Sequence, residues 1–271
     1  PARNLFGTPS RLVGLIVVDA FAAFAWGLFL VGGLITALLS PAYLRHSGCN
    51  HAEYYALMLF AVVGMMIMAA SADLFTLFLG IETMSVAVYV MTGLRRNDVR
   101  ATEAALKYFL MGAFATGFLL FGIAMVYGDT GSVSLTDIAA ASKAGIGTQP
   151  ILALGVVLFL IGMGFKIAAV PFHLWAPDVY EGAPTPVTGF MAVGVKAAAF
   201  AGLLRAVVVG FGADTSGDTV VPFLTALAYL TIIVGNILAV VQRNVKRMLA
   251  YSSVSHRSEE HTSELQSRYV I

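Results

Sequence analysis

Four ionisable side chains stand inside long apolar stretches of this sequence: Glu82, Lys107, Lys166 and Lys196. In the hydrocarbon of a membrane an ionised side chain costs on the order of 3 kcal/mol or more, so a residue of this kind indicates a function. Glu82, Lys166 and Lys196 have apolar residues or glycine on both sides for several positions. Lys107 follows only about two turns of expected helix, from where a lysine can also extend to the membrane interface without any function.

Proton transfer is the chemistry that suits these residue types. Burial disfavours the charged form of a lysine, whereas a nearby carboxylate favours it. Making and breaking a Glu/Lys contact would therefore switch a lysine between holding and releasing a proton. Lys166 and Lys196 could pass protons laterally through intervening water, with His173 as a candidate relay because imidazole titrates near neutral pH. A hydrogen-bonded structural histidine is the alternative interpretation of His173.

Transmembrane helices are the elements that must position these residues. Of the 271 residues, 59% are hydrophobic and 11% charged, and a spanning helix needs about 20 mostly apolar residues. The apolar runs predict spans at 12–39, 52–71, 74–94, 101–127, 150–170, 186–209 and 221–242, with the start of another at 245–255. The predicted fold is an all-α polytopic membrane protein of about seven transmembrane helices.

The strip 171–185 (PFHLWAPDVYEGAPT) interrupts the fifth run. Pro171, Pro177 and Pro184 cannot sustain a regular helix, yet the strip carries aromatic and apolar residues rather than the composition of a solvated loop. We therefore expect a helix broken near Pro171, where protein or water covers the freed backbone groups. A discontinuous helix exposes partial charges and can hinge, and both properties are useful beside a titrating lysine.

Basic residues occur in alternate connections between the runs. The 94–100 connection holds Arg95, Arg96 and Arg100, and alternate crossings place Arg45 and the basic cluster at 243–247 on the same side. The positive-inside rule predicts that this side faces the cytoplasm. The connections at 128–149 and 211–220 then lie on the opposite side.

Composition excludes several other functions. The formal net charge is +1 without a clustered basic face, so the sequence gives no reason to expect a nucleic-acid partner. Cys49 is the only cysteine, which excludes an internal disulfide and leaves too few thiolates for an iron-sulfur cluster or a structural zinc site. Any redox cofactor must therefore sit in another chain.

The end of the sequence differs abruptly from the rest. Residues 257–267 read RSEEHTSELQS, a polar stretch that resembles the in-frame translation of a DNA-sequencing adapter. We therefore predict a membrane domain at 1–256 and a non-native tail at 257–271, with a natural soluble tail as the alternative. Because the sequence also lacks an initiating methionine, we expect it to be a fragment of a longer gene.

Four stretches of the sequence are distinctive: GFKIAAVPFHLWAPDVYEGAPTPVTGFMAVGVKAAAF at 164–200, LFLGIETMSVAVYVMTGL at 77–94, EAALKYFLMGAFATG at 103–117 and VKRMLAYSSVSH at 245–256. They resemble one known family, the antiporter-like membrane subunits of respiratory complex I, the proton-translocating NADH-quinone oxidoreductase. Along the chain, the first of them begins at residue 77 and the last ends at residue 256. The continuation PTPVTGFM favours subunit N over the sibling subunits L and M.

The resemblance implies a role for each buried charge. Glu82 matches the glutamate that pairs with a lysine of a later helix, and Lys166 matches that lysine. We expect their carboxylate and ammonium groups to lie roughly 4–8 Å apart, directly or through one water. Lys196 matches a lysine on the central hydrophilic axis of the family, and Lys107 matches the lysine of its ALKYF segment.

The resemblance also implies a fold and a function. The family is built from two inverted five-helix repeats, each with one broken helix, and this chain is expected to hold the first repeat. Its implied role is proton movement coupled to quinone reduction, as a subunit that is not catalytic alone. NADH, FMN, iron-sulfur clusters and quinone are expected in other subunits, and the expected partners are the other membrane subunits of the complex and the lipid bilayer. The expected location is the bacterial inner membrane.

Two other functions stay open from the sequence. The first is a stand-alone or Mrp-type cation/proton antiporter subunit, which shares this ancestry and the same Glu/Lys arrangement. The second is a purely structural membrane scaffold, in which neutralising Glu82 or Lys166 would affect assembly alone.

Overall fold

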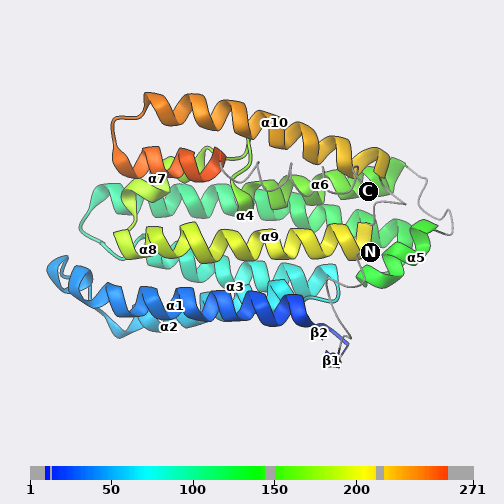
Figure 1. Cartoon of the computed structure of the whole chain (residues 1–271), viewed down its shortest axis with the longest axis horizontal. Coiled ribbons are helices and arrows are strands. Elements are labelled where there is room, and N and C mark those ends of the chain that lie inside the picture. The colour runs from blue at the N-terminus through cyan, green and yellow to red at the C-terminus, as the bar shows by residue number, and fades with distance from the viewer. Residues whose placement is uncertain (1–9, 13, 144–149, 212–216, 256–271) are drawn as a thin grey trace.

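The computed structural model describes residues 10–12, 14–143, 150–211 and 217–255 of the chain. Its long helices run side by side along one axis (Figure 1). The helical elements are α1 (Ala20–His46), α2 (Ala52–Ala70), α3 (Leu74–Thr92), α4 (Val99–Thr130), α5 (Leu135–Lys143), α6 (Pro150–Ile167), α7 (Trp175–Gly182), α8 (Thr185–Phe190), η2 (Met191–Val195), α9 (Lys196–Arg205), η3 (Ala206–Phe211) and α10 (Gly217–Val241), followed by a helical stretch at 245–255. Two short strands, β1 (Ser10–Leu12) and β2 (Ile16–Val18), pair antiparallel before α1.

Seven helical segments in the described part of the chain are long and apolar enough to cross a membrane. They are Ala20–His46, Ala52–Ala70, Leu74–Thr92, Val99–Thr130, Pro150–Ile167, Thr185–Phe211 and Val220–Val241. The sixth segment joins α8, η2, α9 and η3 into one continuous crossing. The predicted number and order of spans are confirmed, and the predicted start of a further helix at 245–255 is helical.

The predicted boundaries of the first span, 12–39, are wrong. The Asp19 backbone is extended, and its carboxylate accepts a hydrogen bond of 2.8 Å from the backbone N–H of Ala22, so Asp19 is the N-cap that starts α1. The β-branched residues just before it belong to β2 instead. At the other end, α1 contains Pro41 and continues to His46.

Glycines allow the central helices to approach closely. A Cβ atom on Gly122 of α4 would lie 2.5 Å from the backbone nitrogen of Phe159 on α6, and one on Gly155 would lie 3.0 Å from the carbonyl oxygen of Gly122. Small residues have this role in membranes because van der Waals packing, and not the hydrophobic effect, holds spanning helices together. The close contact fixes α6, and therefore Lys166 at its end, against α4.

The predicted helix break is present between α6 and α7. α6 ends at Ile167, and Ala168 adopts a left-handed backbone conformation with φ of 59°. Pro171 lies inside the break, as expected. A backbone N–H freed there, on Val170, donates to Thr231 of α10 over 3.0 Å, so protein covers the interruption as membrane burial requires.

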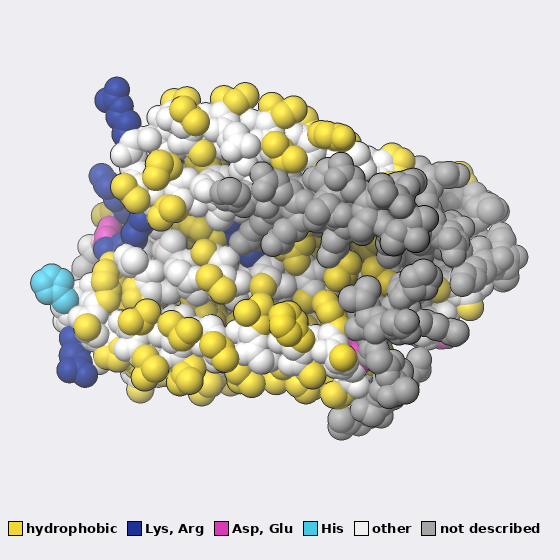
Figure 2. Space-filling view, viewed as in Figure 1, with side chains coloured by type: hydrophobic (Ala, Val, Ile, Leu, Met, Phe, Trp, Pro, Cys, Tyr) yellow, Lys and Arg dark blue, Asp and Glu magenta, His cyan; other side chains and the backbone are white. Residues whose placement is uncertain are grey.

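The two ends of the bundle differ in charge. Lysine and arginine side chains gather at the end that carries the α1–α2 and α3–α4 connections and the segment after α10, which we call the basic end (Figures 1 and 2). The opposite end carries α5, which lies in the segment predicted as a loop at 128–149. Leu135 and Ile138 of α5 are buried, because this short amphipathic helix packs against η3. The tail at 257–271 lies outside the described residues.

Candidate functional site

Lys166 and Glu82 lie next to each other inside the bundle. Lys166 occupies the last turn of α6, and its side chain is 3% exposed. Its Nζ lies 4.0 Å from Oε1 of Glu82 on α3, at the near limit of the expected separation. The same carboxylate oxygen accepts a hydrogen bond of 2.8 Å from the hydroxyl of Thr116 on α4. The helix break and the α3–α4–α6 packing thus bring the two predicted partners together.

Two neutral residues of α3 complete the surroundings of Lys166. Its Nζ donates to the hydroxyl of Ser85 over 2.8 Å and to that of Tyr89 over 3.2 Å. Glu82, Ser85 and Tyr89 are three and four residues apart, so they share one face of the helix. Neither hydroxyl residue was predicted, although the spacing of Ser85 and Tyr89 from Glu82 places them on the same helix face.

Gly112 of α4 makes room for Tyr89. A Cβ atom at this position would overlap the Tyr89 hydroxyl and ring. The Tyr89 ring also meets Tyr108 edge to face, with the ring centroids 4.6 Å apart. The Tyr89 hydroxyl is therefore held at Lys166 by packing on α4.

Lys196 occupies a separate environment. It is fully buried and begins α9 directly after the π-helical turn η2, a kind of turn that occurs frequently at functional sites. Its Nζ donates to the hydroxyl of Ser253 over 2.7 Å and lies 4.9 Å from the centroid of the Tyr180 ring. The cation–π contact with Tyr180 favours the ammonium form, whereas a hydroxyl can hydrogen-bond to the nitrogen in either protonation state. Lys196 was predicted as a site residue, but Ser253 and Tyr180 were not.

Lys107 lies away from Lys166, near the basic end. Its side chain is 45% exposed, and its Nζ lies 2.7 Å from Glu103 and 3.1 Å from Asp178 on α7. The position agrees with a lysine that extends toward the interface. The role of Lys107 in proton transfer stays a prediction.

His173 lies in the break between α6 and α7 and is 4% exposed. Within the part of the chain that the structure describes, neither ring nitrogen has a hydrogen-bond partner. The ring centroid lies 6.1 Å from that of Tyr251 on the last helical stretch. The relay role of His173 stays a prediction.

A second buried ion pair, absent from the sequence analysis, lies toward the opposite end. Arg205 at the end of α9 contacts both carboxylate oxygens of Asp19 at 2.9 Å, and its Nε donates to the carbonyl of Ala69 over 2.7 Å. The exposed fractions of the two side chains are 3% and 1%. Because Asp19 also caps α1 and Arg205 also binds a carbonyl of α2, this pair connects α1, α2 and α9.

Comparison with known proteins places this architecture in a family. The family model for the transmembrane part of NADH:quinone oxidoreductase and Mrp antiporters matches residues 71–258. The NADH-quinone oxidoreductase subunit N of Trichlorobacter lovleyi is 48% identical over 250 residues, which are 92% of this chain and 51% of that protein. The chain thus spans about half the length of this relative.

Solved structures agree with the sequence relatives. A chain of respiratory complex I from Thermus thermophilus, solved with bound aureothin, has a TM-score of 0.77 and 39% identity, and the match covers 94% of this chain and 53% of that one. A chain of the Mrp complex from Dietzia sp. has the same TM-score with 25% identity, covering 90% of this chain and 44% of that one. The chain belongs to the NADH:quinone oxidoreductase/Mrp antiporter transmembrane family.

Proposed function

We propose that this chain acts as part of a proton-translocating membrane subunit of NADH-quinone oxidoreductase, of the subunit N type. The observation that carries the proposal is the buried Lys166 ammonium 4.0 Å from the Glu82 carboxylate, between two membrane-spanning helices. The identity to subunit N relatives, higher than that to the Mrp complex chain, supports this assignment.

The contacts of Lys166 suit reversible proton transfer. Glu82 stabilises the ammonium form, whereas Ser85 and Tyr89 can hydrogen-bond to the amine in either protonation state. A small displacement of Glu82 would remove the only carboxylate paired with Lys166 among the described residues and favour release of its proton. Lys196 is the proposed next acceptor, with His173 and water between them and Lys107 at the basic end.

The remaining parts of the proposal concern the whole enzyme. The subunit would take part in NADH:quinone oxidoreduction as a translocase without being catalytic alone. NADH, FMN, iron-sulfur clusters and quinone would bind to other subunits. Other membrane subunits of the complex would be its direct partners in the bacterial inner membrane, with the basic end facing the cytoplasm.

The test uses the full-length gene in its native complex. Lys166→Ala and Glu82→Gln are introduced separately, and quinone-dependent NADH oxidation and proton pumping are measured in membranes in which assembly has been verified. We expect each substitution to lower both activities by about 100-fold, the lower end of the effect of a well-placed acid or base. Normal pumping by an assembled variant would refute the proposed site, and a loss of assembly alone would favour a scaffold.

An Mrp-type cation/proton antiporter is the second candidate, because the Mrp complex chain shares the fold at a TM-score of 0.77. The two functions differ in their partners. Affinity purification of the tagged full-length protein from its host membrane should recover flavin and iron-sulfur subunits if it belongs to an NADH-quinone oxidoreductase. Recovery of an antiporter complex without flavin would favour the second candidate.

A further inference from the structure

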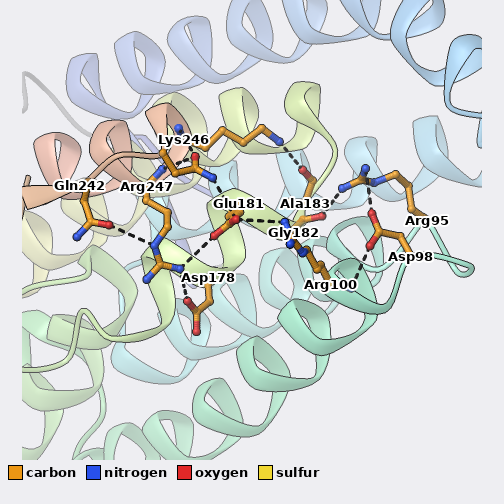
Figure 3. Close-up of polar contacts among 11 residues, drawn as sticks. Arg95, Asp98, Arg100, Asp178, Glu181, Gly182, Ala183, Gln242, Lys246 and Arg247 are labelled. Atoms are coloured by element: carbon orange, nitrogen blue, oxygen red, sulfur yellow. Dashed lines mark hydrogen bonds and ion pairs between the residues drawn. The ribbon is translucent and has the colours of Figure 1, made fainter.

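Carboxylates of α7, near the basic end of the bundle, form ion pairs with two other parts of the chain (Figure 3). Arg247, on the last helical stretch, places NH1 2.6 Å from Asp178 and 3.1 Å from Glu181. Lys107 of α4 contacts the other oxygen of Asp178 at 3.1 Å. We call the pairs of Arg247 with Asp178 and Glu181 the α7 clamp.

Hydrogen bonds reinforce the α7 clamp. Asn244 donates to Glu181 over 3.1 Å, and Lys246 donates to the carbonyl of Ala183 over 3.0 Å. From the other side, Arg95 donates to the carbonyl of Gly182 over 2.7 Å. Cations at these carbonyls are favourable because a helix carries partial negative charge at its carboxyl end. The last helical stretch is therefore fastened to α7 at the basic end.

The two elements that the α7 clamp joins each supply one of the contacts of Lys196 described above. Tyr180, which lies between Asp178 and Glu181 on α7, presents its ring 4.9 Å from the Lys196 Nζ. Ser253, which accepts the hydrogen bond from Lys196, lies on the same helical stretch as Arg247. Six residues separate Arg247 from Ser253, or about 9 Å along a helix. A displacement of Arg247 would therefore be transmitted to Ser253 through less than two turns.

We propose that the α7 clamp is a positioning device for Lys196, so that Arg247, Asp178 and Glu181 govern proton occupancy at Lys196 without themselves carrying the transferred proton. This inference rests on the proposed function, since it assigns Lys196 to the proton path. When the clamp is closed, the Tyr180 ring favours the ammonium form of Lys196, and Ser253 holds its nitrogen in place. When it opens, both contacts weaken together and release of the proton becomes easier.

Each clamp carboxylate faces two cationic side chains. Asp178 faces Lys107 and Arg247, and Glu181 faces Arg100 and Arg247.

The experiment uses the full-length subunit in its assembled complex. Arg247→Gln and Asp178→Asn are made singly and together, and proton pumping per assembled complex is measured across a range of pH. We expect each single variant to lower pumping at least about fivefold, the lower end of typical coupling between sites. The double variant should lose less than the two single effects combined, because both substitutions remove the Arg247–Asp178 pair and each also removes one further pair. The pH profile should also move to lower pH, since the Tyr180 contact that favours the ammonium form is weakened.

Two controls make the result specific. Arg247→Lys keeps the charge and should retain most of the activity. Arg243→Gln removes an exposed charge from the same segment that makes no ion pair within the described residues, and it should leave the rate and the pH profile unchanged. If Arg247→Gln lowers only the yield of complex, with the rate per complex and the pH profile unchanged, the clamp is structural and the inference is overturned.

Lys166→Ala separates failure of this inference from failure of the proposed function. If Lys166→Ala stops pumping while Arg247→Gln pumps normally with an unchanged pH profile, only the clamp inference fails. If Lys166→Ala itself pumps normally, the proton path is wrong and the clamp inference fails with it.

Discussion

At the scale of single residues, the surroundings of Lys166 combine one charged partner with two neutral ones. Glu82 stabilises the ammonium form, while Ser85 and Tyr89 hold the nitrogen in place. Hydrogen bonds to a charged group contribute about 1.5–3 kcal/mol, so the two hydroxyl groups are not incidental. They keep Lys166 at the α3 face when the distance to Glu82 changes.

Tyr89→Phe should therefore reduce proton pumping. The substitution keeps the ring packed against Tyr108 but removes the hydroxyl that accepts from Lys166. We expect a fall of about tenfold in pumping rate per assembled complex, as one lost charged hydrogen bond implies. Tyr55→Phe is the matched control, because that hydroxyl bonds to Asn50 in the exposed connection before α2. An equal effect of both substitutions would show that the Lys166 contact has no special role.

The sequence predicts the charged members of the site but not their neighbours. Glu82, Lys166 and Lys196 are identifiable because a charge inside an apolar run is expensive and therefore rare. Ser253 and Tyr180 carry no such signal, since hydroxyl groups are common in spanning helices and can bond to their own backbone. Their proximity to Lys196 depends on how distant helices pack, which no local pattern encodes.

At the scale of elements, the buried pair of Asp19 and Arg205 decides where α1 begins and what it packs against. Asp19 ends the β2 strand region and caps α1, and Arg205 binds it from the end of α9. The predicted start of this helix at residue 12 was wrong because a short apolar run does not distinguish a strand from a helix. The break after α6 was predictable, by contrast, because several prolines in one strip leave no helical alternative.

Arg205→Ala should destabilise the fold. Removing one member leaves the buried Asp19 carboxylate unpaired, and breaking a buried pair in this way costs about 3–5 kcal/mol. The measurement is thermal unfolding of the purified full-length protein in detergent. The double variant Asp19→Asn/Arg205→Gln should recover part of the loss, since no uncompensated charge remains. Arg96→Ala, which removes an exposed arginine, should leave the melting temperature unchanged within experimental error. If Arg96→Ala lowers the melting temperature as much as Arg205→Ala, the buried pair has no special role in stability.

At the scale of the whole molecule, the order of the seven crossings follows from the sequence, whereas their lateral arrangement does not. Apolar length alone predicts each span. The sequence did not reveal that α4 lies between α3 and α6, where Thr116 bonds to Glu82 and Gly112 admits Tyr89. That arrangement follows from close packing at small residues, which is a property of pairs of helices and not of one apolar run.

The alternation of crossings predicts which end of the bundle faces the cytoplasm, and labelling can test it. Asn97 is exposed at the basic end, and Ala140 is exposed on α5 at the opposite end. The native Cys49 is buried, and this burial raises the pKa of its thiol, so Cys49 should react slowly with the label. The substitution Cys49→Ser in all variants removes any remaining labelling at that position. With a membrane-impermeant maleimide, Asn97→Cys should be labelled in inside-out vesicles and Ala140→Cys in right-side-out vesicles, because basic connections stay in the cytoplasm. The reverse labelling would invert the bundle and place the α7 clamp on the outer side of the membrane.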